Sequence, residues 1–183
     1  MNKTLILAGT SLALALFSST AVAGQGFLRA EIGNSETELD YAGVRADDSD
    51  TSAIFGGGYW FNPNFAIEGH VGTLYNSDLG DDQEADLVTM GIGVAGRTHF
   101  GPDNTGFFIG GRAGVARLTA QVREDTFDVV DDISSTKPYY GVSVGYDFNQ
   151  NWGLSLNYDR RQGDFDGVDV DVDTVSIGGE WRF

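Results

Sequence analysis

The sequence predicts an all-β fold, an eight-stranded antiparallel up-and-down barrel that crosses a membrane. Three observations predict this class. Apolar and polar residues alternate through most of the 183-residue chain, which is the period of a strand with two different faces. Short and long connections between these segments alternate as well, as they do in a meander. Aromatic residues gather at the ends of the segments, as in the interfacial girdles of membrane barrels.

The N-terminal residues 1–23 are expected to be a secretory signal peptide. Lys3 precedes an apolar stretch at residues 5–17, and Ala21-Val22-Ala23 forms an A-x-A cleavage pattern. The apolar stretch is too short for a membrane-spanning helix. We therefore expect cleavage after Ala23 and a barrel domain over residues 24–183.

Eight segments of the remaining chain have the strand period. We expect strands over residues 26–34, 51–61, 65–75, 87–100, 106–121, 136–148, 152–162 and 170–183. Three connections are tight turns rich in Asn, Gly and Pro, such as Asn62-Pro63-Asn64. The other four, residues 35–50, 76–86, 122–135 and 163–169, are expected as long loops. Both ends of the barrel domain then lie at the short-turn end.

The alternation also assigns the two faces of the sheet. Large apolar residues such as Met90, Ile92 and Val94 share one parity, whereas the other parity holds Gly, Ala, Ser and charged residues. An apolar exterior around a narrow polar interior accounts for this division. An unpaired buried charge is very costly, so a charge-balanced interior is expected. The predicted ion-pair network is structural and consists of Arg29, Glu31, Glu68, Arg97, Arg112, Asp147, Asp159, Arg161, Glu180 and Arg182.

The composition excludes several classes of function. The formal net charge is −16, whereas nucleic-acid binding needs a basic surface. The chain has no cysteine, which excludes thiol nucleophiles and cysteine-bound zinc. Of the 27 acidic residues, 21 fall in the long connections or at the start of the last strand. The sequence thus predicts an acidic rim at one end of the barrel.

One acidic run could bind a metal ion. Residues 164–173 read DFDGVDVDVD, but the glycine and the twelfth residue do not match an EF-hand loop. Clustered carboxylates can still hold Ca²⁺ or Mg²⁺ weakly, and the candidate ligands are Asp164, Asp166, Asp169 and Asp171. The alternative is a solvated acidic rim without a cation. No other cofactor is expected.

The complete pattern resembles the small outer-membrane β-barrel proteins of the OmpA/OmpX-like, opacity-type group. The features that carry the resemblance are the Ala-Val-Ala ending of the leader, the eight alternating segments, the Asn and Pro turns, and the final segment VSIGGEWRF. The resemblance implies an exported monomer in the outer membrane of a Gram-negative bacterium, in contact with lipid and lipopolysaccharide. It also implies that Trp181 and Phe183 belong to the signal read by the outer-membrane assembly machinery.

A fold of this kind leaves the function open. We expect a non-enzymatic protein that acts in envelope integrity, surface interaction or adhesion through acidic extracellular loops. A small ion-conducting, porin-like channel is the first alternative, followed by an outer-membrane lipid-modifying enzyme and a soluble lipocalin-like binder. His70 and His99 are the candidate catalytic bases, although hydrogen bonding inside the barrel accounts for both. The Gly91-x-Gly93-x-x-Gly96 pattern lies within a strand, so it indicates space in the interior rather than a dinucleotide site.

Overall fold

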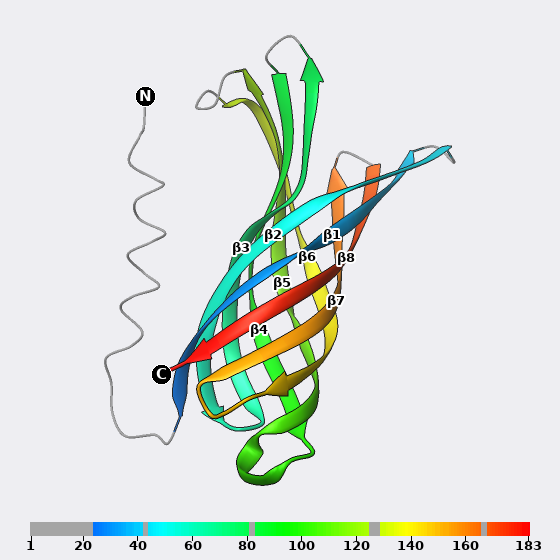
Figure 1. The fold of residues 1–183 in the computed structure, drawn as a ribbon. Coiled ribbons are helices and arrows are strands. Elements are labelled where there is room, and N and C mark those ends of the chain that lie inside the picture. The colour runs from blue at the N-terminus through cyan, green and yellow to red at the C-terminus, as the bar shows by residue number, and fades with distance from the viewer. Residues whose placement is uncertain (1–23, 42–43, 81–82, 125–128, 166–167) are drawn as a thin grey trace.

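The computed structural model describes residues 24–41, 44–80, 83–124, 129–165 and 168–183. These residues form one closed antiparallel barrel in which each strand pairs with its neighbours in the chain and β1 pairs with β8 (Figure 1). The strands are β1 Gln25–Tyr41, β2 Val44–Asn62, β3 Phe65–Gly80, β4 Gln83–His99, β5 Gly106–Glu124, β6 Val129–Asp147, β7 Trp152–Phe165 and β8 Val168–Arg182. The predicted fold class is therefore confirmed. The expected signal peptide lies outside the described residues.

The three short connections are built from the turn residues that the sequence indicates. In two of them an asparagine side chain caps the turn: Asn64 donates its backbone N–H to Asn62 Oδ1 at 2.8 Å, and Asn151 does the same to Asn149 Oδ1 at 2.8 Å. The third contains the 3-10 turn η2, Pro102–Asn104, where Asp103 has a φ of 53°. Asn and Asp tolerate such left-handed positions, which explains their use here.

The prediction of four long loops is wrong in one respect. Most of their residues continue the strands, so that the barrel ends in long β-hairpins; residues 42–43, 81–82, 125–128 and 166–167 of the turns lie outside the described residues. Hydropathy did not reveal these extensions because the outward side chains beyond the membrane meet water and are no longer apolar. Backbone pairing then continues without an apolar face.

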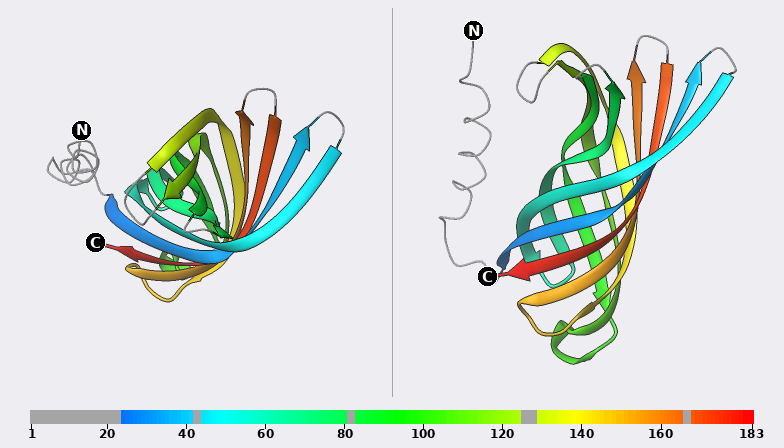
Figure 2. Two further views of the ribbon diagram at one scale, coloured as in Figure 1. Left: turned by 90° about the horizontal axis from the view of Figure 1, so that it is seen from above. Right: turned by 45° about the horizontal axis from the view of Figure 1, so that its top comes forward.

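The hairpins divide into two groups. Pairing between β2 and β3 ends at Ala53 and Thr73, and pairing between β6 and β7 ends at Tyr139 and Arg161, although all four strands continue. The barrel wall therefore separates into one sheet of β7, β8, β1 and β2 and another of β3 to β6. Figure 2 shows the two groups of hairpins diverging.

The two faces of the barrel follow the predicted parity. Along β8, Trp181, Ile177 and Val175 are exposed, whereas Ser176, Gly178 and Glu180 on the opposite parity are buried. The exposed large apolar side chains form a belt around the barrel, and aromatic residues such as Phe107 and Trp152 stand at its short-turn edge. In the described residues no helix is long and apolar enough to cross a membrane.

Candidate functional site

The middle of the barrel interior contains an ion-pair group of three arginines and three carboxylates. Arg112 donates two hydrogen bonds to Glu31, at 2.7 and 2.9 Å, and further ones to Asp159. Arg29 lies 2.7 Å from Glu31 and 2.7 Å from Glu68. The six members are Arg29, Glu31, Glu68, Arg112, Asp159 and Arg161. The formal charges cancel within this group, as burial requires.

Arg161 is the least satisfied member of this central group. Its side chain is buried, yet its ion pair with Asp159 spans 4.0 Å and its hydrogen bond to Thr174 spans 3.5 Å. Its guanidinium also lies 5.8 Å from the ring centroid of Tyr139, which adds a weak cation–π contact. Arg161 is therefore held mainly by long-range attraction to the group.

A second, separate ion-pair group lies nearer the short turns. Asp147 accepts a hydrogen bond from Arg182 at 2.7 Å, and its Oδ2 lies 2.7 Å from His99 Nε2. Arg97 donates to Glu180 at 3.0 Å. The two arginines balance the two carboxylates. An apolar cluster that contains Phe27 and Trp60 lies beside these charges, and the Arg97 guanidinium lies 3.9 Å from the Trp60 ring centroid.

The structure thus brings together all ten charged residues assigned to the interior, but in two neutral groups rather than one. A cavity of about 40 Å³ lies between the groups and is lined by Arg29 and Arg112 from one and by Arg97, Asp147 and Glu180 from the other. One water needs about 10–15 Å³ of such space, so the cavity has room for a few waters and for no larger solute. The interior is packed rather than open.

The two histidines have interior roles. His70 is buried and its ring meets Tyr139 edge-on at 5.0 Å, while the Tyr139 hydroxyl donates to Glu68 at 2.8 Å. A Cβ on Gly93 would lie 2.6 Å from that hydroxyl, which explains a glycine at this position. Within the described residues neither histidine is hydrogen-bonded to a hydroxyl group, so no nucleophile–base pair is formed.

The hairpin end carries acidic residues on its outward face. In the β1–β8 register Glu36 lies opposite Asp173 and Glu38 opposite Asp171. Arg160 of β7 donates to Asp171 at 2.7 Å and to Asp173 at 3.1 Å. The hydrogen bond to Asp171 and the negative charge of Asp173 raise the pKa of Arg160 above its ordinary value. One arginine thus serves two of four neighbouring carboxylates, and the outward face keeps a negative charge.

The candidate cation ligands receive different partners. Asp171 is held by Arg160 at 2.7 Å, and Asp164 lies 3.6 Å from Lys137. Asp166 lies outside the described residues, and Asp169 belongs to β8 opposite Asp40. Where side chains are described, no group of three or more His, Asp or Glu residues is arranged to hold a metal ion. A cation site at this rim stays a prediction.

Sequence reasoning missed an apolar cluster inside the barrel at the hairpin end. It consists of Ile54, Leu74, Leu87, Leu118, Val170 and Val172. A signal was present in the sequence. Val170 and Val172 have the inward parity of β8 and alternate with the outward Asp171 and Asp173, the reverse of the apolar-out pattern of the membrane belt.

Comparisons with known proteins agree with this architecture. A family model described as the outer membrane protein beta-barrel domain matches residues 9–183, whereas no curated protein matches the sequence. Among solved structures, Ail, the attachment invasion locus protein of Yersinia pestis, in complex with the heparin analogue sucrose octasulfate, is 17% identical with a TM-score of 0.58 over 87% of this chain and 99% of that chain. Neisserial surface protein A is 15% identical with a TM-score of 0.60, covering 86% and 97%. OprG from Pseudomonas aeruginosa is 14% identical with a TM-score of 0.57, covering 88% and 96%. Identities this low establish a common fold and no common ligand.

Proposed function

Because this chain belongs to the outer membrane protein beta-barrel domain family, we propose that it is a non-enzymatic surface protein whose acidic hairpins act in envelope integrity and surface interaction. The observation that carries the proposal is the continuation of the strands beyond the apolar belt. From Val175 in β8 to the terminal Phe183 the belt covers nine residues, which at about 3.3 Å per residue and a tilt of about 40° span about 23 Å, close to the apolar band of about 25 Å. The outward Asp173 and Asp171 come directly above it.

The direction of insertion follows from the same charges. Aspartates are costly at membrane depth, so the hairpin end belongs in water. In outer-membrane barrels the short turns face the periplasm and the longer connections face the exterior. We therefore assign the hairpins to the cell surface. In this proposal a signal peptide at residues 1–23 directs export, Trp181 and Phe183 contribute to recognition by the assembly machinery, and the barrel works as a monomer.

The proposed contact with the envelope is a cation-bridged one. The outward carboxylates Glu36, Glu38, Asp171 and Asp173 stand where lipopolysaccharide phosphates would meet the barrel, and two anionic surfaces repel each other. Ca²⁺ or Mg²⁺ between them would turn repulsion into attraction. Binding of the folded protein to immobilised lipopolysaccharide should therefore fall in EDTA and return with Mg²⁺. Equal binding with and without EDTA would contradict the bridge.

A charge-neutralised hairpin variant supplies the control for that experiment. Replacing Glu36 and Glu38 by Gln and leaving the interior untouched should reduce the effect of EDTA, because fewer carboxylates remain to hold a cation. The same variant should fold normally, since both side chains are exposed. A variant that keeps the full EDTA effect would show that other groups hold the cation.

The surface partner that fits these hairpins is basic rather than sulfated. The Ail structure holds the heparin analogue sucrose octasulfate, which is a polyanion. The charged residues of the described hairpins here are mostly acidic. The diverging sheets also end the β2–β3 pairing early, and strand edges of this kind accept extended peptides. We expect the protein to bind basic peptides in a salt-sensitive manner and to ignore heparin in EDTA. Stronger binding of heparin than of a basic peptide would contradict this choice.

The other candidate functions agree less well with the arrangement of the side chains. A soluble lipocalin-like binder would carry its apolar residues inside, but Met90, Ile92 and Ile177 are more than 60% exposed on the outer face. A lipid-modifying enzyme lacks a nucleophile beside His70 or His99 in the described residues. An ion-conducting channel conflicts with the packed ion-pair groups, and recording in planar bilayers tests it directly: unitary conductance steps would favour the channel.

A further inference from the structure

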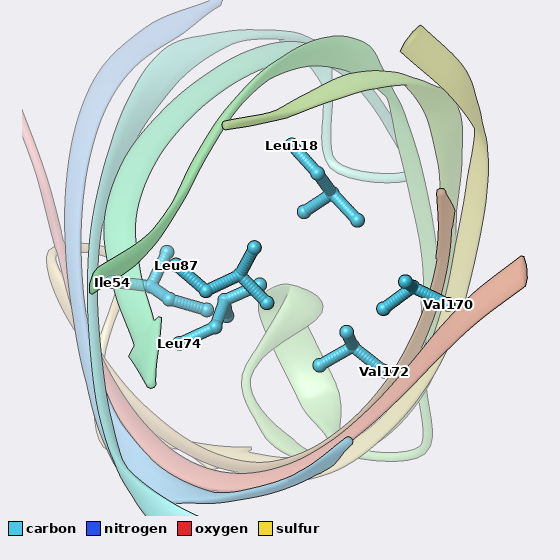
Figure 3. Packing of buried hydrophobic residues seen from close by; sticks show 6 residues of the cluster. All are labelled: Ile54, Leu74, Leu87, Leu118, Val170 and Val172. Atoms are coloured by element: carbon cyan, nitrogen blue, oxygen red, sulfur yellow. The ribbon is translucent and has the colours of Figure 1, made fainter. Parts of the chain in front are cut away.

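The apolar cluster of six side chains forms a layer across the interior of the barrel. Figure 3 shows the six side chains pointing from opposite walls toward the centre. Leu74, Leu118 and Val172 are completely buried, and the other three are at most 7% exposed. The charged part of the interior lies between this cluster and the second apolar cluster, which contains Phe27 and Trp60 near the short turns.

The position of the layer coincides with the point where the barrel wall opens. The last β2–β3 pair is Ala53 with Thr73. Ile54 lies one residue before this end of the pairing on β2, and Leu74 lies one residue past it on β3. Three members, Ile54, Val170 and Val172, belong to the sheet of β7, β8, β1 and β2, and the other three belong to the sheet of β3 to β6. The layer thus joins the two sheets at the level where they diverge.

The groups below the layer have the opposite character. Ser176 on β8 donates a hydrogen bond to Glu31 at 3.3 Å and lies two inward positions deeper than Val172. The central ion-pair group and the cavity of about 40 Å³ follow. Polar walls of this kind offer hydrogen bonds to water, whereas the apolar layer above them offers none.

We propose that the cluster of Ile54, Leu74, Leu87, Leu118, Val170 and Val172 is the permeability barrier of the barrel on its hairpin side. Aliphatic side chains offer no hydrogen bond to water and no counter-charge to an ion, so a narrow apolar constriction excludes both. The ion-pair groups then hold the barrel together, and the apolar layer seals it. This role goes beyond the surface function proposed above and does not depend on it.

The absence of cysteine from the chain permits a direct test of access to the interior. A single S176C substitution places a thiol below the layer, and T51C places one on the exposed outward face of β2. Each variant is folded in lipid nanodiscs and treated with a charged methanethiosulfonate reagent. We expect S176C to react at least about a hundredfold more slowly than T51C, because reaction requires the layer to open.

Removing the layer should then expose the thiol. Adding L118S and V172S to S176C removes one aliphatic group from each sheet and should raise the rate of modification at least about tenfold. The matched control is L156S, the same chemical change on the lipid-facing side of β7, which should leave the rate unchanged. If the double serine variant does not fold, as judged by heat-modifiable gel mobility, L118A with V172A replaces it.

Two results would overturn the proposal. In the first, S176C reacts as fast as T51C while the layer is intact, so that the layer does not exclude solutes. In the second, a folded variant with the layer removed reacts no faster than S176C alone, so that the ion-pair groups form the seal. Lipopolysaccharide binding measured on the same variants reports on the surface function separately.

Discussion

Glu31 is the residue on which the central ion-pair group depends most. It accepts two hydrogen bonds from Arg112, at 2.7 and 2.9 Å, and lies 2.7 Å from Arg29. The substitution Glu31→Gln keeps the shape of the side chain and removes its charge. Three arginines then face two carboxylates in the middle of the barrel. One of the three buried arginines is then left without a carboxylate to balance its charge.

The expected cost follows from this imbalance. Breaking a buried, hydrogen-bonded ion pair by neutralising one partner costs about 3–5 kcal/mol, and Glu31 takes part in two such pairs. Partial hydrogen bonding by the new amide offsets some of the loss. We therefore expect Glu31→Gln to lower the free energy of unfolding by about 4 kcal/mol.

The assay is equilibrium unfolding by urea of the barrel in lipid vesicles, followed by the fluorescence of its three tryptophans. The matched control is Glu36→Gln, on the same strand but exposed at the hairpin end, where we expect a change within about 0.5 kcal/mol. A second substitution, Arg161→Gln, should recover about 2 kcal/mol in the Glu31→Gln background because it restores the charge balance and removes the least satisfied arginine.

Two outcomes would refute the reasoning. A loss of less than about 1 kcal/mol for Glu31→Gln, equal to that of Glu36→Gln, would mean that water screens the interior charges. A further loss on adding Arg161→Gln would mean that Arg161 contributes favourable contacts beyond charge. The first result would require a more hydrated interior than the burial of these side chains indicates.

Three further predictions concern single positions. Gly93→Ala should lower the free energy of unfolding by about 1–3 kcal/mol, because the new Cβ displaces the Tyr139 hydroxyl from its hydrogen bond; urea unfolding measures it, and an unchanged midpoint would contradict the contact. Phe183→Ala should lower the yield of heat-modifiable barrel in the outer membrane while a folded fraction keeps near-normal stability, since the predicted role is in assembly; a full yield in cell fractions would contradict it. His70→Phe should leave the lipid A species of the cell unchanged in mass spectrometry, and any change in them would revive an enzymatic role.

Several parts of the fold could be predicted from the sequence because the responsible rules are local. A strand has a side-chain period of two, so the parity of Met90 or Trp181 is decided by its neighbours in the chain. The tight turns carry their own signal, since Asn62 and Asn149 cap them through their side chains. The charge balance of the interior could also be predicted, because a buried charge needs an opposite charge whichever residue supplies it.

The lengths of the hairpins could not be predicted in this way. Beyond the membrane the outward side chains meet water, so residues such as Glu36 and Glu38 continue β1 without the apolar outward face that marks a membrane strand. Their strand conformation depends on backbone pairing with a neighbour, and pairing leaves no mark in the composition of a single strand. For the same reason the early end of the β2–β3 and β6–β7 ladders was not foreseeable.

The sequence by itself determined the strands, their two faces and the sign of the charges that the interior must hold. Only the tertiary structure decided that Arg112 meets Glu31 and Asp159, 81 and 47 residues away in the chain, and that aliphatic residues from five strands close into one layer. The physical reason is that parity is set along one strand, whereas the identity of a partner across the barrel is set by the register and stagger of all eight strands when the sheet closes.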